Sequence, residues 1–268
     1  MDDFKKYFSA SETENPLDTL VSDGGYCGVL RTIACVGDSL SSGEFESKDA
    51  EGKTGYHDYF DYSWGQYLAR MAGCTVYNFS RGGMTAHQYT DSFAEQKGFW
   101  STEKAAQGYI IALGVNDIYY SDIEFGDISD ICLDNYNNNR KTFVGCYAKI
   151  IQRYKEIQPK AKFFLVTLPR ANDTPERNEK ADKHAKLLYQ LAKMFDNTYV
   201  LDLRKYGPIY DEEFSSLFYL GGHMNAMGYL FTAKLIASYI DYIIRHNMDD
   251  FRQIGFVGTP YHNPNYKW

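Results

Sequence analysis

Several features that mark well-defined protein classes are absent from this chain. It has five cysteines, an odd number, widely spaced and without a CxxC pair or a histidine at metal-ligand spacing: Cys27, Cys35, Cys74, Cys132 and Cys146. They predict buried thiols in a reducing compartment and no metal site. The charged N-terminus lacks the apolar stretch of a signal peptide, and no run of about 18 apolar residues is present to span a bilayer. We expect a cytoplasmic protein without membrane contact.

The chain also lacks an excess of positive charge and the usual nucleotide-binding motifs. Its 28 lysines and arginines are outnumbered by 35 aspartates and glutamates, which gives a formal net charge of -7. Nucleic-acid binders usually carry a basic face, so we expect no nucleic-acid partner. Neither GxxxxGK[ST] nor GxGxxG occurs, which argues against a bound nucleotide. The GxSxG motif of the α/β-hydrolases is missing as well.

What the sequence does contain is an ordinary core and an unusual supply of tyrosine. Hydrophobic residues make up 44% of the chain and charged residues 24%, as in a typical globular protein. Tyrosine occurs 24 times. Its flat apolar face and polar tip suit the binding of sugar rings, but they also suit packing at the edge of a core. Both interpretations of the tyrosines remain open.

Short stretches rich in β-branched or aromatic residues alternate with helical patterns. Five such stretches predict buried strands: Arg31–Val36, Thr75–Phe79, Tyr109–Leu113, Lys162–Leu168 and Thr198–Leu203. Apolar residues at helical spacing lie between and after them, at 64–71, 143–154, 176–195 and 226–246. This alternation predicts an α/β fold in three layers, α/β/α, around a five-stranded parallel sheet. The ligand crevice is then expected beyond the carboxyl ends of the strands.

The predicted globular domain spans residues 31–248. Residues 1–30 predict an N-terminal arm with a short helix around Asn15 to Val21, and residues 249–268 predict a C-terminal tail packed on the domain. The segment from Tyr119 to Lys141 is long, polar and rich in asparagine, and it predicts a loop across the mouth of the site. Neither an internal repeat nor a linker rich in proline, glycine or serine is present.

The motif Gly37-Asp38-Ser39-Leu40 follows the first predicted strand and delivers a serine into a tight turn. A serine that stands clear of a strand end, with free N–H groups nearby, is a candidate nucleophile. Taken alone, such a turn is more typical of a structural role, in which Asp and Ser bond the local backbone.

Three further motifs stand at later turns of the chain. They are Ser80-Arg81-Gly82-Gly83-Met84-Thr85, Gly114-Val115-Asn116-Asp117 and Gly221-Gly222-His223-Met224-Asn225. Exposed N–H groups at a glycine-rich helix start favour an anion. The amide of Asn116 is an uncharged donor suited to an oxyanion, and Asp117 could hold that amide in place. Each motif has a structural alternative: a tight glycine turn, an Asn-Asp turn and a structural histidine.

The four blocks in this order resemble those of the SGNH or GDSL hydrolases, whose signature residues are Ser, Gly, Asn and His. The resemblance covers roughly Arg31 to His246 and implies a flavodoxin-like SGNH hydrolase fold. It implies Ser39 and His223 as catalytic residues, with Ser39, Gly83 and Asn116 forming the oxyanion hole. The pattern Asn78-x-Ser80-x-x-Gly83-x-Thr85 is similar to the family's second block, and Gly82 is the alternative to Gly83.

One position departs from the family pattern. The last block usually reads Asp-x-x-His, but Leu220 stands three residues before His223. The missing carboxylate normally fixes the tautomer of the imidazole. A backbone carbonyl, with that of Leu220 as first candidate, could accept the Nδ1 hydrogen bond and give a Ser-His dyad. Alternatively, a carboxylate could come from Asp202, Asp211, Glu212 or Glu213, or the chain could be a weakened or inactive homologue.

The resemblance implies a serine esterase that works through an acyl-enzyme and needs neither a metal nor an organic cofactor. An acidic, tyrosine-rich chain favours a short acyl ester, such as an acetyl ester on a carbohydrate or another small polar molecule. One alternative is a lipid or lysophospholipid acylhydrolase, and another is a non-catalytic carbohydrate-binding homologue. The sequence does not specify an oligomeric state.

Overall fold

Five parallel strands form the central sheet of the computed structural model, which describes residues 11–265. They are β1 (Thr32–Gly37), β4 (Thr75–Ser80), β5 (Gly108–Ala112), β6 (Lys162–Val166) and β8 (Thr198–Leu201). Their order across the sheet is β4-β1-β5-β6-β8, the doubly wound order of flavodoxin-like folds. The five predicted strands are confirmed, with ends that differ by up to two residues.

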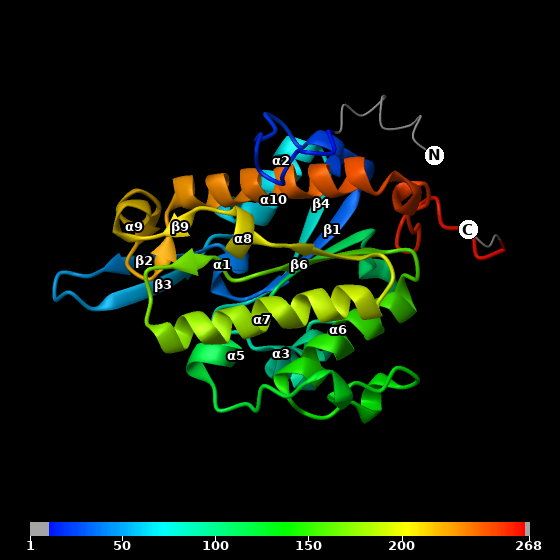
Figure 1. Ribbon diagram of the computed structural model, residues 1–268, viewed down its shortest axis with the longest axis horizontal. Helices are drawn as coiled ribbons and strands as arrows, with labels where there is room; N and C mark the ends of the chain where they lie inside the picture. The colour runs from blue at the N-terminus through cyan, green and yellow to red at the C-terminus, as the bar shows by residue number, and fades with distance from the viewer. Residues whose placement is uncertain (1–10, 266–268) are drawn as a thin grey trace.

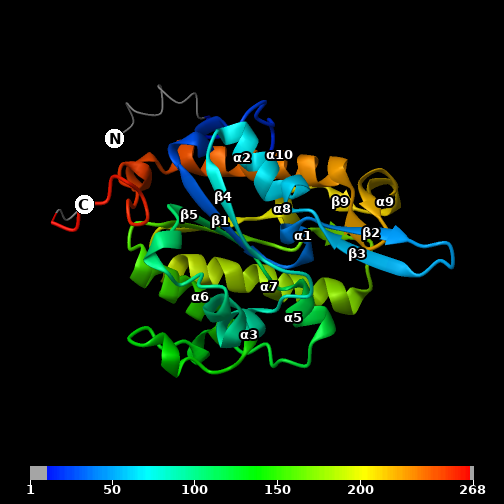
Figure 2. The ribbon, with the colours of Figure 1, turned by 180° about the vertical axis from the view of Figure 1, so that it is seen from behind.

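Alternating side chains of β1 show how the sheet builds two cores. Ile33 and Cys35 pack into the layer that contains α2 (Trp64–Ala72) and α10 (Ala226–His246). Ala34 and Val36 point the other way, into the layer that contains α6 (Phe143–Ile157) and α7 (Pro175–Met194). Figures 1 and 2 show the sheet between these two helical layers. The predicted three-layer α/β/α fold is therefore confirmed.

The long helices begin where a polar side chain caps the first turn. Ser63, Thr142, Thr174 and Asn225 each accept a hydrogen bond from a backbone N–H at the start of α2, α6, α7 and α10. Pro175 occupies the first position of α7, where an N–H would have no partner within the helix, so the missing N–H of proline loses no hydrogen bond. The four helical patterns predicted from the sequence are all helices in the structure.

Shorter helices connect these elements. They are α1 (Ser39–Ser42), α3 (Ala86–Gln88), α4 (Ala94–Gln96), α5 (Val115–Tyr120), α8 (Leu203–Tyr206) and α9 (Glu212–Phe218). A π-helical turn covers Tyr89–Phe93, and 3-10 turns cover Gly25–Val29, Phe60–Tyr62, Thr102–Lys104, Ile128–Asp130, Tyr136–Asn138 and Met248–Phe251. Within residues 11–265, no helix is long and apolar enough to cross a membrane.

The carboxyl end of β1 is the point where the chain direction across the sheet reverses. The chain continues from β1 to β4 on one side, and only later reaches β5 on the other side. A crevice opens at such a switch point, where ligands bind in open α/β sheets. Gly37 ends β1 there, and a Cβ at this position would run into the Ser41 hydroxyl. Only glycine lets α1 pack this closely on the strand end.

Three small two-stranded sheets were not predicted from the sequence. The hairpin of β2 (Glu44–Lys48) and β3 (Thr54–Asp58) is the largest, and it extends beyond the carboxyl edge of the main sheet in Figures 1 and 2. The other two pair β7 (Arg170–Ala171) with β9 (Ile209–Tyr210), and β10 (Tyr219–Leu220) with β11 (His223–Met224). All three additions surround the end of the sheet where β1 stops.

Two predictions about connecting segments are wrong. The stretch from Asn15 to Val21 forms turns and no helix. The segment from Tyr119 to Lys141 does not cross the mouth of the site, because most of it lies along α6. The carbonyl of Cys132 accepts a hydrogen bond from Gln152, and Tyr136 donates one to Glu156, both on α6. Asparagine-rich polarity marked the segment as a loop but carried no information about the surface on which it packs.

Both ends of the described chain pack on the main domain. In the N-terminal arm, Glu14 forms an ion pair with Arg245 at 2.7 Å, and the N–H of Val21 bonds Ser238 on α10. In the C-terminal tail, the carbonyls of Gly255 and Val257 accept hydrogen bonds from the buried amides of Gln107 and Gln158. Residues 1–10 of the predicted arm and 266–268 of the predicted tail lie outside the described residues.

Candidate active site

Ser39 is the first residue of α1 and follows β1 after a single intervening residue. That residue, Asp38, caps the helix, because its side chain accepts a hydrogen bond from the Leu40 N–H at 3.0 Å. The N–H of Ser39 lies ahead of the first intrahelical hydrogen bond and so remains a donor at the positive end of the helix. Ser39 is half-buried at the switch point of the sheet.

The second and third sequence blocks lie on either side of Ser39, after β4 and β5, and side chains connect them. The Asn116 amide donates to the Met84 carbonyl at 3.1 Å, and the Asp117 carboxyl accepts from the Ala86 N–H at 2.9 Å. These bonds use one amide hydrogen of Asn116 and leave the other as a donor. Gly83, whose φ is 68°, presents an N–H that no atom of residues 11–265 accepts. The N–H of Gly83 and the free amide hydrogen of Asn116 are therefore two candidate oxyanion donors on segments that these bonds hold together.

Two carboxyls of these sequence blocks are buried. Asp38 is 2% exposed and Asp117 is 1% exposed. Burial raises the pKa of each to about 7, because a charged carboxylate loses its hydration there, and in each case backbone hydrogen bonds oppose part of the effect. Asp38 also raises the pKa of Asp117 through its charge. Near neutral pH, each carboxyl can therefore exist with or without its proton.

His223 lies on β11, and β11 lies beside both α1 and β2. Its Nδ1 is 2.6 Å from an Oε1 of Glu46, a residue of β2. The same Glu46 oxygen accepts the Gly222 N–H at 2.9 Å, so one carboxylate holds both the ring and the turn that carries it. The carboxylate that the last block lacks is supplied here from the β2–β3 hairpin.

The acceptors expected from the sequence are therefore corrected. Asp202 caps α8 and accepts from the Tyr189 hydroxyl at 2.8 Å, and Asp211 caps α9. Neither contacts His223. Leu220 pairs with His223 through the backbone of the two-residue β10–β11 ladder, while the ring nitrogen is taken by Glu46. A carboxylate at 2.6 Å is a stronger acceptor than a neutral carbonyl, which accounts for the preference.

A second carboxylate faces the other ring nitrogen. Nε2 of His223 is 3.0 Å from Oε1 of Glu44, two residues before Glu46 on the same face of β2. A neutral imidazole has a single N–H, yet both of its nitrogens face a carboxylate oxygen. Burial raises the pKa of Glu44, and the charge of His223 opposes part of that rise, so Glu44 keeps its proton to a higher pH than an exposed glutamate does.

Neither glutamate was predicted from the sequence as a site residue. The available signal was the alternation Glu44-Phe45-Glu46, which places the two carboxylates on one face of a strand and Phe45 on the other. Phe45 packs on Tyr59, Tyr62 and Tyr229, and this packing fixes the face that the glutamates present. Without knowledge that the segment is a strand, the spacing carries no meaning. Within the described residues, no group of His, Cys, Asp and Glu is arranged to hold a metal ion.

One family of known proteins matches most of the chain. The model of the GDSL-like lipase/acylhydrolase family matches residues 35–230. The chain belongs to this family. The match starts within β1 and ends within α10, so it contains all four sequence blocks. Among curated proteins, none matches the sequence.

Solved structures of carbohydrate esterases share the fold of this GDSL-like protein. A family two carbohydrate esterase from Clostridium thermocellum in complex with cellohexaose is 15% identical with a TM-score of 0.55, covering 82% of this chain and 65% of that chain. The carbohydrate acetylesterase Est24 from Sinorhizobium meliloti is 17% identical with a TM-score of 0.50, covering 80% and 99%. The acetyl xylan esterase AlAXEase is 16% identical, also with a TM-score of 0.50, covering 78% and 99%. At these identities the likeness concerns the fold.

Proposed function

We propose that this GDSL-like protein is a serine esterase with Ser39 as nucleophile and His223 as general base. The observation that carries the proposal is the position of Ser39 at the start of α1, beside β11 and its histidine, with Glu46 at Nδ1. A nucleophile, a base and a group that orients the base form the arrangement used for acyl transfer. Family membership supports an ester hydrolase as the class of enzyme.

The proposed reaction has two balanced halves. The Ser39 hydroxyl attacks the ester carbonyl and its proton passes to Nε2 of His223, while the N–H groups of Ser39 and Gly83 and the Asn116 amide bind the oxyanion. The ester C–O bond then breaks, and the proton on Nε2 goes to the leaving alcohol. Water repeats the sequence on the acyl-Ser39 ester and releases a carboxylic acid.

Glu46 and Glu44 act on opposite sides of the base. Glu46 keeps a proton on Nδ1 and stabilises the imidazolium that forms during attack, the function that an aspartate has in the usual triad. Glu44 instead occupies Nε2, the nitrogen that must accept the Ser39 proton. Ser39 and Glu44 therefore compete for one position, and the active form is the one in which Glu44 has released Nε2.

We further propose a small polar alcohol, such as a sugar, as the substrate's leaving group. Tyr56, Tyr59 and Tyr62 are each more than half exposed on the hairpin and the turn after it. Tyr56 packs edge-on against the His223 ring, with centroids 5.8 Å apart. Exposed aromatic faces next to the base suit the apolar faces of sugar rings. The structural neighbours named as carbohydrate esterases support this choice over a lipid substrate.

Hydrolysis of p-nitrophenyl acetate by the purified protein tests the esterase proposal. We expect turnover by the wild type and a loss of at least about 10³-fold in kcat for Ser39→Ala, because the nucleophile is removed. Ser47→Ala, on the outer half of the hairpin, serves as the matched control and keeps activity. Turnover that is equal in wild type and Ser39→Ala would contradict the proposal. Activity that rises steadily with linear acyl chains beyond about eight carbons would instead support a lipid acylhydrolase.

A further inference from the structure

The face of the β2–β3 hairpin that lies against His223 carries carboxyl groups and one aromatic ring. Residues paired directly across an antiparallel ladder point to the same side, and here Glu44 is paired with Asp58 and Glu46 with Tyr56. Glu46 and Tyr56 both contact the His223 ring, so this side of the hairpin faces the proposed base. The surface next to the base is therefore acidic, with an aromatic ring at Tyr56.

Glu44 has a single cationic partner. Among residues 11–265 that partner is His223, whose Nε2 lies 3.0 Å from a Glu44 oxygen, and no lysine or arginine forms an ion pair with this carboxyl. Burial raises the pKa of Glu44; the charge of His223 lowers it, and the charges of Asp58 and Glu46 raise it. A Glu44 carboxylate that is released from His223 is therefore left beside negative charges, without a cation from residues 11–265.

Catalysis requires that release, because Nε2 must accept the Ser39 proton and Glu44 occupies it in this structure. The same carboxyl also reaches the oxyanion turn, since a Cβ at Gly82 would collide with a Glu44 oxygen. The backbone of Glu44 is held in place, because the buried Tyr229 donates its hydroxyl hydrogen to the Glu44 carbonyl at 2.6 Å. Release therefore means a rotation of the Glu44 side chain, and a half-buried charge needs a new partner.

An exposed aromatic ring stands beside this carboxyl. Tyr56 is 60% exposed and packs edge-on against the His223 ring, with ring centroids 5.8 Å apart. The face of an aromatic ring attracts a cation, and quaternary ammonium ligands are recognised in this way. Glu44 and Tyr56 thus offer a negative charge and a ring face on the same side of the hairpin.

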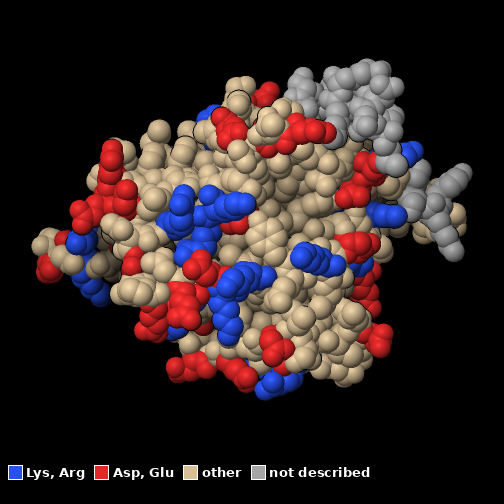
Figure 3. Space-filling view, in the orientation of Figure 1, with Lys and Arg blue, Asp and Glu red and all other residues tan. Residues whose placement is uncertain are grey.

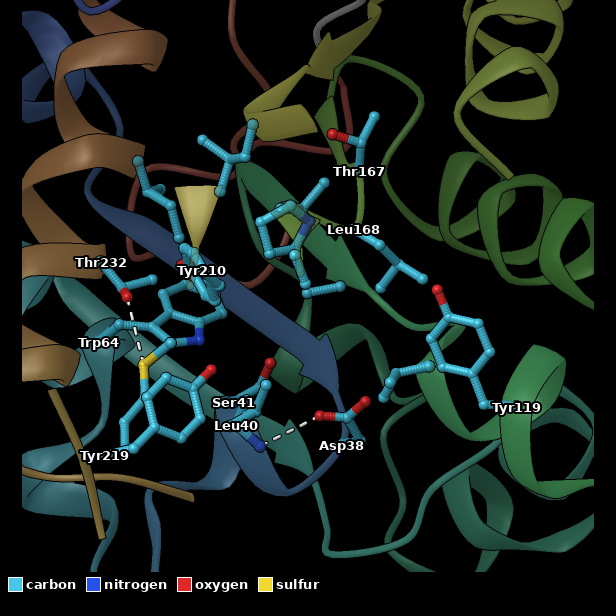
Figure 4. Close-up of a pocket in the computed structure, with 18 of the residues that line it drawn as sticks. Asp38, Leu40, Ser41, Trp64, Tyr119, Thr167, Leu168, Tyr210, Tyr219 and Thr232 are labelled. Carbon is cyan, nitrogen blue, oxygen red and sulfur yellow. Dashed lines mark hydrogen bonds between the residues drawn. The ribbon is translucent and has the colours of Figure 1, made fainter. Parts of the chain in front are cut away.

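The alcohol of the ester is the part of the substrate that meets this side. In the proposed reaction the proton on Nε2 of His223 passes to the oxygen of the leaving alcohol, so the alcohol lies next to the ring. The cavity of about 210 Å³ in Figure 4 is a different space, because neither His223 nor Glu44 nor Tyr56 lines it. Substituents near the alcohol oxygen therefore contact the hairpin.

We propose that Glu44 sets a preference for esters whose leaving alcohol carries an ammonium group, as amino alcohols and amino sugars do. The inference rests on the esterase function proposed above and specifies the alcohol of that same site. The ammonium group contacts the Glu44 carboxylate and the Tyr56 ring, which stabilises ionised Glu44 away from Nε2 and leaves that nitrogen for the Ser39 proton. A neutral alcohol offers Glu44 no charge, so its esters are cleaved with lower kcat/KM.

Acetylcholine and 3,3-dimethylbutyl acetate provide the direct comparison, because the two esters have the same shape and differ by one positive charge. Each kcat/KM is divided by the rate constant for hydroxide hydrolysis of the same ester. We expect acetylcholine to exceed the neutral ester by at least about tenfold, the effect of an ammonium group beside a half-buried carboxylate and an aromatic face.

Matched variants locate the preference. Glu44→Gln removes the charge and keeps the size of the side chain, and it should reduce the acetylcholine advantage to about twofold or less. Glu51→Gln removes the same charge at the exposed tip of the hairpin and should keep the full advantage. Tyr56→Leu should lower the advantage by about threefold, the effect of one exposed cation–π contact. A general disturbance of the site would lower kcat/KM for both esters alike, so the ratio separates the preference from an effect on folding.

The outcomes separate the two proposals. Equal corrected rates for the two esters, or no measurable cleavage of acetylcholine by a protein that cleaves p-nitrophenyl acetate, would overturn the preference while leaving the esterase in place. An advantage that Glu44→Gln retains, or that Glu51→Gln also loses, would overturn the assignment to Glu44. No Ser39-dependent cleavage of any ester, p-nitrophenyl acetate included, would overturn the proposed function itself.

Discussion

At the scale of single residues, the proposed mechanism depends on Glu46 and Glu44, which face the two nitrogens of His223. Glu46 is 2.6 Å from Nδ1 and Glu44 is 3.0 Å from Nε2. Both carboxylates come from one short strand, yet their expected effects on catalysis are opposite. Glu46 orients the imidazole and stabilises its charged form. Glu44 contacts Nε2, the nitrogen that must accept the Ser39 proton, and so competes with Ser39.

Replacing Glu46 by glutamine keeps an oxygen near Nδ1 but removes the charge that stabilises the imidazolium. We expect kcat to fall by about 10²- to 10⁴-fold with little change in KM, by analogy with the removal of that charge from a serine-protease triad. Steady-state kinetics on p-nitrophenyl acetate measures the effect. The control is Glu51→Gln, the same substitution at the exposed tip of the hairpin, where kcat should not change. A full kcat in Glu46→Gln would exclude Glu46 as the positioning residue.

Replacing Glu44 by glutamine should have a different signature. Burial raises the pKa of Glu44, and the substitution removes this titrating carboxyl and its charge from beside Nε2, so the acid limb of the kcat/KM profile should move to lower pH. The other acidic groups near this position, Asp38, Glu46 and Asp58, remain unchanged and keep the site acidic. Full pH–rate profiles of the two proteins provide the measurement. A limb that moves to higher pH, or does not move, would show that Glu44 leaves the base unaffected.

At the scale of elements, the five strands and four long helices were predictable, and the β2–β3 hairpin was not. β1, β5 and β6 are buried on both faces, so continuous apolar runs mark them, and polar caps mark the helix starts. The hairpin is half-exposed and rich in charged residues, so its strands resemble a loop in the sequence. The contact of Glu46 with His223 joins positions 177 residues apart. No sequence feature near Glu46 or near His223 predicts this contact.

The hairpin should couple stability to catalysis through Phe45. Phe45→Ala removes the ring that packs on Tyr59, Tyr62 and Tyr229, and we expect the free energy of unfolding to fall by about 2 kcal/mol. Because the same contacts fix the face that carries Glu44 and Glu46, kcat should fall by at least about tenfold. Urea unfolding and steady-state kinetics measure the two effects.

Tyr77→Ala is the matched control for this element. Tyr77 is also partly buried and stacks on Phe79 in the opposite core, with ring centroids 5.9 Å apart. Its loss should lower stability without lowering kcat. If both variants lost kcat in proportion to their stability, the hairpin would have no specific effect on the site.

At the scale of the whole molecule, the buried acids predict how stability varies with pH. Burial raises the pKa of Asp38 and Asp117 from the unperturbed 3.8 to about 7. Between these values the folded protein holds more protons than the unfolded chain, so this contribution to stability falls as pH rises and is fully present only below about pH 4.

Thermal unfolding of Asp117→Asn tests that sign. The variant has one fewer titrating group, so its Tm should fall less than that of the wild type between pH 5 and pH 8. Asp134→Asn, at an exposed position, should keep the wild-type slope. A steeper fall in Asp117→Asn would contradict the raised pKa of the buried carboxyl.

One face of the molecule carries a mixture of positive and negative charges. The face in Figure 3 carries both signs of charge, with lysines and arginines across its middle. Some cations of the molecule are paired, such as Arg204 with Asp182 at 2.6 Å and Lys180 with Glu176 at 2.9 Å. Such paired charges do not form the uninterrupted basic face that a polyanion needs. The substrate proposal therefore depends on the site itself and not on long-range charge.

The most direct test of the central claim is covalent labelling with a serine-reactive p-nitrophenyl phosphonate, followed by mass spectrometry of the digested protein. We predict one phosphonyl adduct per chain, on Ser39, formed far more slowly in His223→Ala because the base is lost. An adduct on another residue, labelling of Ser39 at equal rates in both proteins, or no adduct on folded wild-type protein would contradict the claim that Ser39 is a nucleophile activated by His223.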